Sequence, residues 1–480
     1  MEANMDSSFK IGKRIFFTAM IILLLLMIAA GIMTRIVPTG SYERYVLDGR
    51  LTIDPASFHY TDVELYPVWR WFTAPIEVLW SDDGLMVIAI ILFILIIGGS
   101  ISVLNESHLL HYVLAKMVKR YSSRKYGLMA IIVLVFMLFG AFMGIFEEII
   151  PLIPFVIALS YSLGWDAVTG LAMSLLAAGF GFSAAIANPF SVGVAQRLSD
   201  LPLFSGAWYR GITFVVIYAI LLLFIRRYAL RMDDKNKDLF NRLNEGKIEE
   251  KSFNLPEESP ALNRAYRFFI ILILLLVLLL VSTVFIKGIS DYLLPLIGLL
   301  FLIAGIGSSL LAGMSLRHIF KTFGNGILGI APGIVLILMA TSVKYIIFQA
   351  GIMDTILFSA SNWIADSSPF TAIMSVYLLV LFLNFFIGSA TAKAFLVMPI
   401  IIPLADLIGL NRQLMVLAFA FGDGFSNVLY PTNAVLLIGL GLANINYTTW
   451  FKWVIKLQVI IFIITSILLW IAYMLDYGPY

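Results

Sequence analysis

Long uncharged stretches are the feature that most constrains what this chain of 480 residues can fold into. A helix that crosses the hydrocarbon core of a bilayer needs about 20 apolar residues. With 61% hydrophobic and only 13% charged residues, the chain carries more apolar surface than a water-soluble fold could bury. The sequence therefore predicts an all-α, polytopic membrane protein. The stretches are the apolar run Ile15 to Val37 and then Gly84 to Asn105, Gly127 to Phe146, Ala167 to Gln196, Gly211 to Ile225, Phe268 to Ile286, Tyr292 to Leu316, Thr322 to Val343, Ser367 to Ala392, Gly424 to Phe451 and Leu457 to Leu475.

The first apolar run has basic residues before it, as a signal peptide would: Lys10, Lys13 and Arg14. It is too long for the apolar region of a signal peptide and lacks a cleavage site of small residues. We interpret it as a retained first helix, with the N-terminus in the cytoplasm of a bacterial cell whose inner membrane holds the protein.

Composition excludes several kinds of site. Cysteine is absent, so disulfides, thiolate catalysis and cysteine metal ligands are excluded. The four histidines show no metal-ligand spacing, and 32 basic against 29 acidic residues give no sign of nucleic-acid binding. We expect no cofactor and no catalytic residues, with lipid and a small-molecule substrate as partners.

Two polar segments organise the chain. Residues 38–83 contain the sequence VWRWFTAPIEVLW, whose tryptophans favour a helix at the headgroup level. Residues 226–267 carry charges of both signs and two prolines, which indicates a cytoplasmic linker. The predicted division is an N-terminal repeat over 1–225, the linker over 226–267, and a C-terminal repeat over 268–480.

The two halves share motifs in the same order. GFGFS at Gly179 to Ser183 is followed by NPF and WYR, as GDGFS at Gly422 to Ser426 is followed by YPT and WFK. Upstream, GIFEE at Gly144 to Glu148 and SATAK at Ser389 to Lys393 precede a proline by equal distances. We interpret this series as an internal repeat.

Charge predicts that the halves lie in opposite directions. The loop after the second apolar stretch contains five basic residues, so the positive-inside rule places it in the cytoplasm. Its counterpart, residues 351–370, contains Asp354 and Asp366 and no basic residue, and should face outward. An inverted-topology repeat is typical of secondary transporters. The five basic residues are Lys116, Lys119, Arg120, Arg124 and Lys125.

Prolines and charges then indicate where a transport site would lie. Pro189 and Pro431 interrupt long uncharged stretches, so both helices should be unwound there, although an ordinary kink between packed helices is an alternative. Glu147, Glu148 and Lys393 interrupt apolar sequence at two hairpin tips. Ionisable groups in the membrane usually mark a substrate or ion pathway, and charges at the membrane surface are the alternative.

These motifs resemble the YfcC family, a branch of the ion transporter superfamily that also includes anaerobic C4-dicarboxylate carriers and arginine–ornithine antiporter-like proteins. The resemblance rests on GIFEEIIPLIPF with NPFSVGVAQ, and on SATAKAFLVMPIIIPLADLIG with FGDGFSNVLYPTNAVLL. It implies two re-entrant hairpins, two interrupted helices and a homodimer. In the first half the tip is a glutamate pair instead of the family's hydroxyl pair. The implied or inferred substrate-binding residues are Glu147, Glu148, Asn188, Pro189, Ser389, Thr391, Lys393, Pro431, Thr432 and Asn433.

The glutamates favour a cationic or zwitterionic solute, so we expect a carrier for amino acids, with basic amino acids among the candidates, working by antiport or by symport with sodium or a proton. If Lys393 pairs with either glutamate, a C4-dicarboxylate or other organic anion remains an alternative. A channel or a membrane-embedded enzyme is a less favoured alternative. Oxygen-bearing side chains beside unwound backbone are the sodium candidates: Asn188, Asp423, Ser426 and Asn427.

Overall fold

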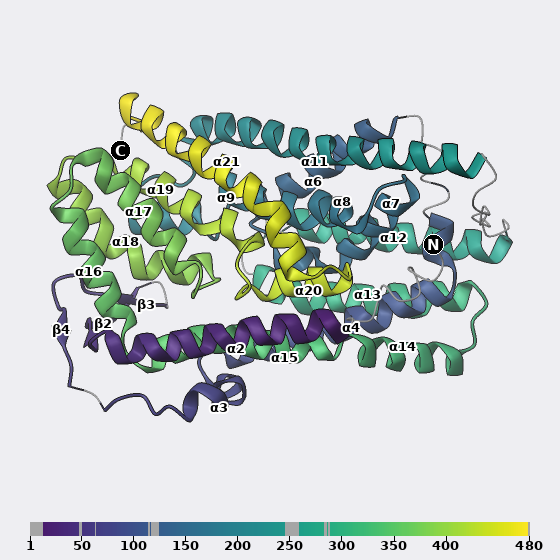
Figure 1. Cartoon of the computed structure of the whole chain (residues 1–480), viewed down its shortest axis with the longest axis horizontal. Coiled ribbons are helices and arrows are strands. Elements are labelled where there is room, and N and C mark those ends of the chain that lie inside the picture. The colour runs from purple at the N-terminus through teal and green to yellow at the C-terminus, as the bar shows by residue number, and fades with distance from the viewer. Residues whose placement is uncertain are drawn as a thin grey trace.

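The computed structural model of the chain describes residues 13–47, 50–62, 64–113, 116, 124–244, 259–282, 286 and 289–478. Within this part, ten helices are long and apolar enough to cross a bilayer. Most of the helices run along the longest axis of the molecule (Figure 1). The predicted all-α membrane architecture is confirmed, and the chain is an integral multi-pass membrane protein.

The segment after the first helix forms two short antiparallel strand pairs, β1 (Gly40–Ser41) with β4 (His59–Tyr60) and β2 (Arg44–Leu47) with β3 (Arg50–Ile53). Asp354 holds this segment against the second half, because it accepts a hydrogen bond from the backbone N–H of Tyr42 and forms an ion pair with Arg44 at 2.8 Å. The tryptophan-rich segment forms the short helix α3 (Arg70–Glu77) and the 3₁₀ turn η1 (Val78–Trp80).

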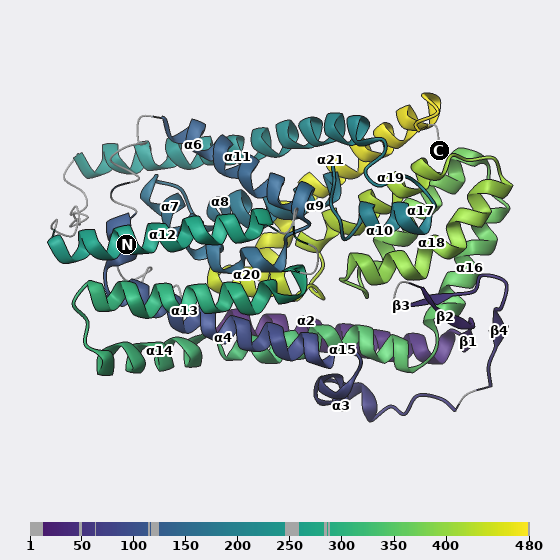
Figure 2. The same ribbon diagram turned by 180° about the vertical axis from the view of Figure 1, so that it is seen from behind.

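One group of helices, which we call the framework, lies along one side of the molecule. In it α2 packs on α15, and α4 packs on both α13 and α14 (Figures 1 and 2). Its outer faces carry exposed leucines and isoleucines, as lipid-facing helices do. The framework helices are α2 (Lys13–Ile36), α4 (Gly84–Glu106), α12 (Pro260–Ser282), α13 (Leu293–Leu311), α14 (Leu316–Ile330) and α15 (Pro332–Gln349), with the 3₁₀ turn η6 (Ile289–Tyr292) before α13.

The remaining helices form two series with the same order: a helical hairpin, an interrupted helix and a long closing helix. In the first series these are α6 (Lys125–Leu138) with the π-helical turn η3 (Phe139–Met143), η4 (Glu147–Leu152) and α7 (Ile153–Ser162); then α8 (Ala167–Leu171), η5 (Ala172–Leu176), α9 (Ala177–Ala184) and α10 (Val192–Leu198); then α11 (Ala207–Asn244). In the second series they are α17 (Pro369–Leu383) and α18 (Ala390–Leu407); then α19 (Arg412–Gly424), η7 (Phe425–Val428) and α20 (Ala434–Leu442); then α21 (Tyr447–Met474), all preceded by α16 (Met353–Ala365).

The two hairpins lie toward opposite ends of the molecule. In Figure 1, α7 and α8 lie toward the right end of the molecule and α17 and α18 toward the left, and Figure 2 shows the same separation from behind. The inverted repeat with two interrupted helices is therefore present in the fold. That the hairpins re-enter the membrane stays a prediction.

The first interrupted helix lies wholly in the interior. In Ala167–Ala184 every residue except the partly buried Val168 is buried, whereas only 28% of the most apolar part of Phe16–Ile36 is buried. Backbone that leaves the helical pattern here is surrounded by protein, which is the condition under which a membrane protein tolerates it. The predicted unwinding at Pro189 is confirmed, because α9 ends at Ala184 and α10 begins at Val192. The same holds at Pro431, which lies between η7 and α20.

The predicted division into domains stays a prediction. Helix α11 continues past residue 225 to Asn244, and residues 245–258 of the predicted linker lie outside the described residues. Lys10, Lys119 and Arg120, on which the orientation partly rests, also lie outside them.

The orientation leads to a first prediction. The chain has no cysteine, so one introduced thiol reports the side on which a residue lies. We expect a membrane-impermeant maleimide to label Ser368→Cys, between α16 and α17, in intact cells, and to label Arg124→Cys only after permeabilisation, because the basic loop should be cytoplasmic. Labelling of both from the same side would contradict the inverted orientation.

Candidate functional site

The first hairpin tip, residues 144–148, is shaped by a glycine. Gly144 has a φ of +66°, which disfavours any side chain. A Cβ there would also lie 2.4 Å from Oδ1 of Asn188. The glycine therefore lets the tip close on the first break, residues 185–191, where the backbone N–H of Ala187 donates to the carbonyl of Ala141 at 3.0 Å.

Side chains satisfy the backbone of the first break. Asn188 accepts hydrogen bonds from the N–H groups of Phe190 at 2.9 Å and Ser191 at 3.2 Å. Arg210 is 2% exposed and donates to the carbonyl of Ile186 at 3.1 Å and 3.2 Å. Unwound backbone would be unstable in the interior without such partners. Asn188 and Arg210 thus have structural roles at the break.

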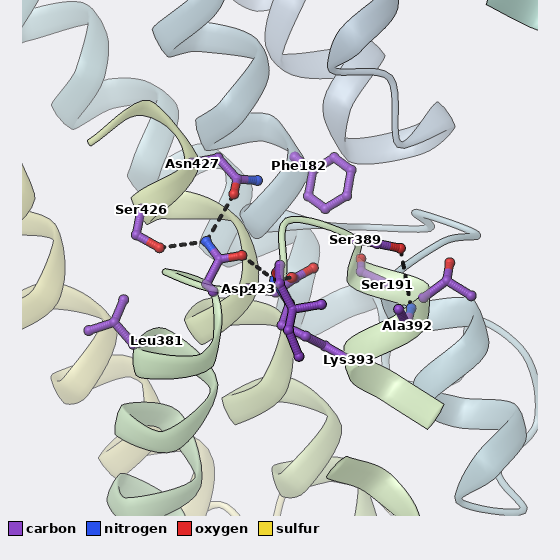
Figure 3. A network of polar contacts seen from close by, with 12 residues as sticks. Phe182, Ser191, Leu381, Ser389, Ala392, Lys393, Asp423, Ser426 and Asn427 are labelled. Carbon is purple, nitrogen blue, oxygen red and sulfur yellow. Dashed lines mark hydrogen bonds and ion pairs between the residues drawn. The ribbon is translucent and has the colours of Figure 1, made fainter. Parts of the chain in front are cut away.

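The second hairpin tip, residues 384–389, holds a buried ion pair. Lys393, in the first turn of α18, is 0% exposed, and its Nζ lies 2.6 Å from Oδ1 of Asp423 at the end of α19. The ammonium also donates to the carbonyl of Ile387 at 2.7 Å and to Oδ1 of Asn384. The ammonium thus donates two hydrogen bonds and lies at ion-pair distance from Asp423, whose oxygens accept no hydrogen bond within the described residues. Figure 3 shows this group of polar contacts.

Asn384 connects the ion pair to η7. Its Nδ2 donates to Oγ of Ser426 at 2.6 Å and to Oδ1 of Asn427 at 2.9 Å (Figure 3). Oδ2 of Asp423 is buried and has no hydrogen-bond partner in the described part of the chain. The sodium candidates Asp423, Ser426 and Asn427 thus lie in one network around an ammonium group. Asn188 uses its oxygen in the first break instead.

The second break, residues 429–433, is held by its own hairpin. Thr432 donates to the carbonyl of Phe385 at 2.5 Å, and Tyr430 donates to that of Leu381 at 3.1 Å. Asn433 caps α20 by accepting from the N–H groups of Val435 and Leu436. Both breaks therefore lie against the tip of their own half.

Each half also reaches the other. Thr391, in α18, donates to the carbonyl of Phe190 in the first break at 3.0 Å. A Cβ on Gly424 would lie 2.4 Å from Oγ of Ser183, so the end of α19 touches the end of α9. Ser389 caps α18 through the N–H of Ala392 at 3.3 Å. Pro189 and Pro431 lie in the two breaks, as the sequence predicts.

Glu147 and Glu148 stand apart from all of these contacts. Both side chains are half-buried at the first tip, and η4 packs against α20 and α13. Oε2 of Glu148 accepts a hydrogen bond from the N–H of Phe146 at 3.1 Å. Neither glutamate has an ion-pair partner among the described residues, where Lys393 pairs with Asp423 instead. Two adjacent carboxylates without a counter-ion are unfavourable away from water.

Sequence reasoning missed two residues of this site, Asn384 and Arg210. Each is a polar side chain next to or within a long apolar stretch, a signal that marks function or helix packing in membrane proteins. The sequence also suggested an ion pair between Lys393 and one of the glutamates. In the structure Lys393 pairs with Asp423 instead. Among the described residues, no group of three or more histidine, aspartate or glutamate side chains could hold a metal ion.

Comparisons with known proteins agree with the resemblance found in the sequence. The family model for C4-dicarboxylate anaerobic carriers, DcuC, matches residues 16–474. The chain is 28% identical over 496 residues to the "Putative basic amino acid antiporter YfcC" of Escherichia coli (strain K12), covering 95% of this chain and 96% of that one. It is 25% identical over 385 residues to an uncharacterized protein of Haemophilus influenzae, covering 79% and 74%.

Two solved transporters align over nearly the full length. The YdaH transporter of Alcanivorax borkumensis is 17% identical with a TM-score of 0.43, covering 96% of this chain and 100% of that one. MtrF of Neisseria gonorrhoeae, described as illuminating a class of antimetabolite efflux pumps, is 16% identical with a TM-score of 0.42, covering 96% and 97%.

Proposed function

The chain belongs to the DcuC family of C4-dicarboxylate anaerobic carriers, and from this membership and its glutamate tip we propose that it is a secondary antiporter for basic amino acids. The observation that carries the proposal is the pair Glu147 and Glu148, half-buried and without an ion-pair partner in the described part of the chain. The carrier works by alternating access and catalyses no chemical reaction.

The internal repeat explains why the two tips differ in charge. In the repeat alignment, Glu148 occupies the position of Lys393, and Phe180 occupies that of Asp423. The second half thus neutralises its tip charge with its own aspartate, whereas the first half has a phenylalanine there. A guanidinium or ammonium group of the solute would supply the missing positive charge.

The charges at the two tips argue against an organic anion as the substrate. A dicarboxylate needs positive groups, and the ammonium of Lys393 already contacts Asp423, Asn384 and Ile387. The glutamates would also repel it. The name of the Escherichia coli relative, a basic amino acid antiporter, agrees with the electrostatics better than the description of the family model does.

The rest of the amino acid would lie between the breaks. Because η4 packs against α20, a solute bound at Glu147 and Glu148 would lie beside α20, which begins directly after the second break. Helix N-termini favour carboxylates, so the α-carboxylate would lie beside Pro431, Thr432 and Asn433. The further predicted residues, Asn188, Pro189, Ser389 and Thr391, would form the walls.

Two features of the cycle are part of the proposal. The protein functions as a homodimer in a bacterial inner membrane with its N-terminus in the cytoplasm. Exchange of one basic amino acid for another substrate of equal charge would let the glutamates stay neutralised throughout. Sodium or proton symport remains the alternative cycle, with Asp423, Ser426 and Asn427 as the ion site.

Counterflow in proteoliposomes tests the function. Vesicles loaded with unlabelled arginine, lysine or ornithine should accumulate external labelled arginine transiently, because exchange is obligatory for an antiporter. Vesicles loaded with succinate or with buffer should not. Exchange driven by succinate would support the dicarboxylate carrier instead, and unsaturable flux without counter-substrate would indicate a channel.

A further inference from the structure

The strongest unassigned feature of the molecule is the oxygen cage around Lys393. The ammonium is 0% exposed and lies against a carboxylate oxygen, an amide oxygen and a backbone carbonyl oxygen, from Asp423, Asn384 and Ile387. Such a mixture beside unwound backbone is how membrane carriers coordinate sodium. Here the cation that occupies it is a side chain of the protein.

We propose that the ammonium of Lys393 acts as a built-in cation in the place of a coupling sodium ion. It joins the second tip to the end of α19 through its contacts with Asn384, Ile387 and Asp423. Because lysine carries a compact point charge, it can take the place of a monovalent ion in a cage of oxygens. The inference requires that the chain is a carrier, but it is independent of the substrate.

The surroundings of the cage support an ion site. Asn384 donates to Ser426 and Asn427, so both N–H groups of its side-chain amide are used and its oxygen is turned toward the ammonium. Oδ2 of Asp423 is buried without a hydrogen-bond partner within the described ranges, and is free to contact a cation placed beside Oδ1. Removal of the lysine side chain would leave a negatively charged, oxygen-lined space.

The response of four proteins to sodium separates this role from an ordinary ion pair. Lys393→Ala opens the space, so we expect sodium chloride to raise the melting temperature of the purified variant by about 1–2 °C at ten times the dissociation constant, relative to choline chloride. Lys393→Met fills the space and should show no sodium response. Lys393→Ala with Asp423→Asn removes the charge and should also show none. The wild-type protein should melt equally in both salts.

A matched control covers general effects of salt. Lys344 forms an ion pair with Asp83 that is partly exposed, so Lys344→Ala should melt equally in sodium and choline. If Lys393→Ala is recovered only when purified in sodium, the proposal is supported. Failure of sodium to stabilise or recover Lys393→Ala overturns it, and so does a sodium response in the wild-type protein that Asp423→Asn removes. Because melting needs no substrate, these outcomes are independent of the counterflow result.

Discussion

Replacing Glu148 with glutamine is expected to reduce arginine exchange by roughly 10- to 100-fold, because a hydrogen bond to a charged group contributes about 1.5–3 kcal/mol. Glutamine keeps the shape of the side chain and removes its charge. Counterflow of labelled arginine in proteoliposomes measures the effect. Glu147→Gln should give a loss of the same kind if both carboxylates face the solute.

Stability separates this effect from damage to the fold. Neither glutamate has an ion-pair partner in the described part of the chain, so removing one of two like charges should leave the melting temperature unchanged or raise it. Glu106→Gln is a matched control, because Glu106 is exposed and pairs with His318 at 3.2 Å. Its exchange rate should stay at the wild-type level. Normal arginine exchange by both tip variants would contradict the proposed substrate.

Replacing Lys393 with methionine is expected to destabilise the protein by about 3–5 kcal/mol, because Asp423 would keep a buried charge without a partner. The melting temperature should fall by roughly 3 to 5 °C, since the entropy of unfolding scales with the 480 residues of the chain. Two double variants identify the acidic residue that pairs with Lys393. Lys393→Met with Asp423→Asn should recover most of the loss, since it removes both charges, whereas Lys393→Met with Glu148→Gln should not.

The comparison of these variants forms a double-mutant cycle, and residues in direct contact give coupling energies that distant residues do not. The partly exposed ion pair of Lys344 with Asp83 shows how large a loss of stability to expect from an ordinary surface pair. Lys344→Met should lower stability by no more than about 1 kcal/mol, because surface pairs contribute little. Recovery by Glu148→Gln rather than Asp423→Asn would mean that the tips neutralise each other. The preference for a basic amino acid would then lose its physical basis.

The sequence predicts the architecture well because each signal for it is local. Gly179 and Gly422 introduce the motifs that end both interrupted helices, and Pro189 and Pro431 remove helix donors where the structure unwinds. The repeat then relates the halves without any knowledge of contacts. The helix order and the positions of both breaks follow from these features alone.

Pairing in the site could not be predicted in the same way. Lys393 and Asp423 lie 30 positions apart. Three acidic residues of the predicted site could pair with Lys393: Asp423, Glu147 and Glu148. The choice depends on Asn384, which turns its oxygen to the ammonium, and on the close packing of α17 against α19. Asp423 therefore suggested a sodium ligand, since nothing in its neighbouring residues reveals an ammonium group.

The contact between Gly424 and Ser183 has a consequence for the stoichiometry of transport. With no room for even a methyl group between the ends of α19 and α9, and with Thr391 bonded to the carbonyl of Phe190, the two breaks cannot separate without losing both contacts. Under the proposed alternating access, we therefore expect the two breaks to move together, as one unit, relative to the framework. A carrier built in this way would transport one solute per chain in each half-cycle, because its two breaks would open to the same side at the same time.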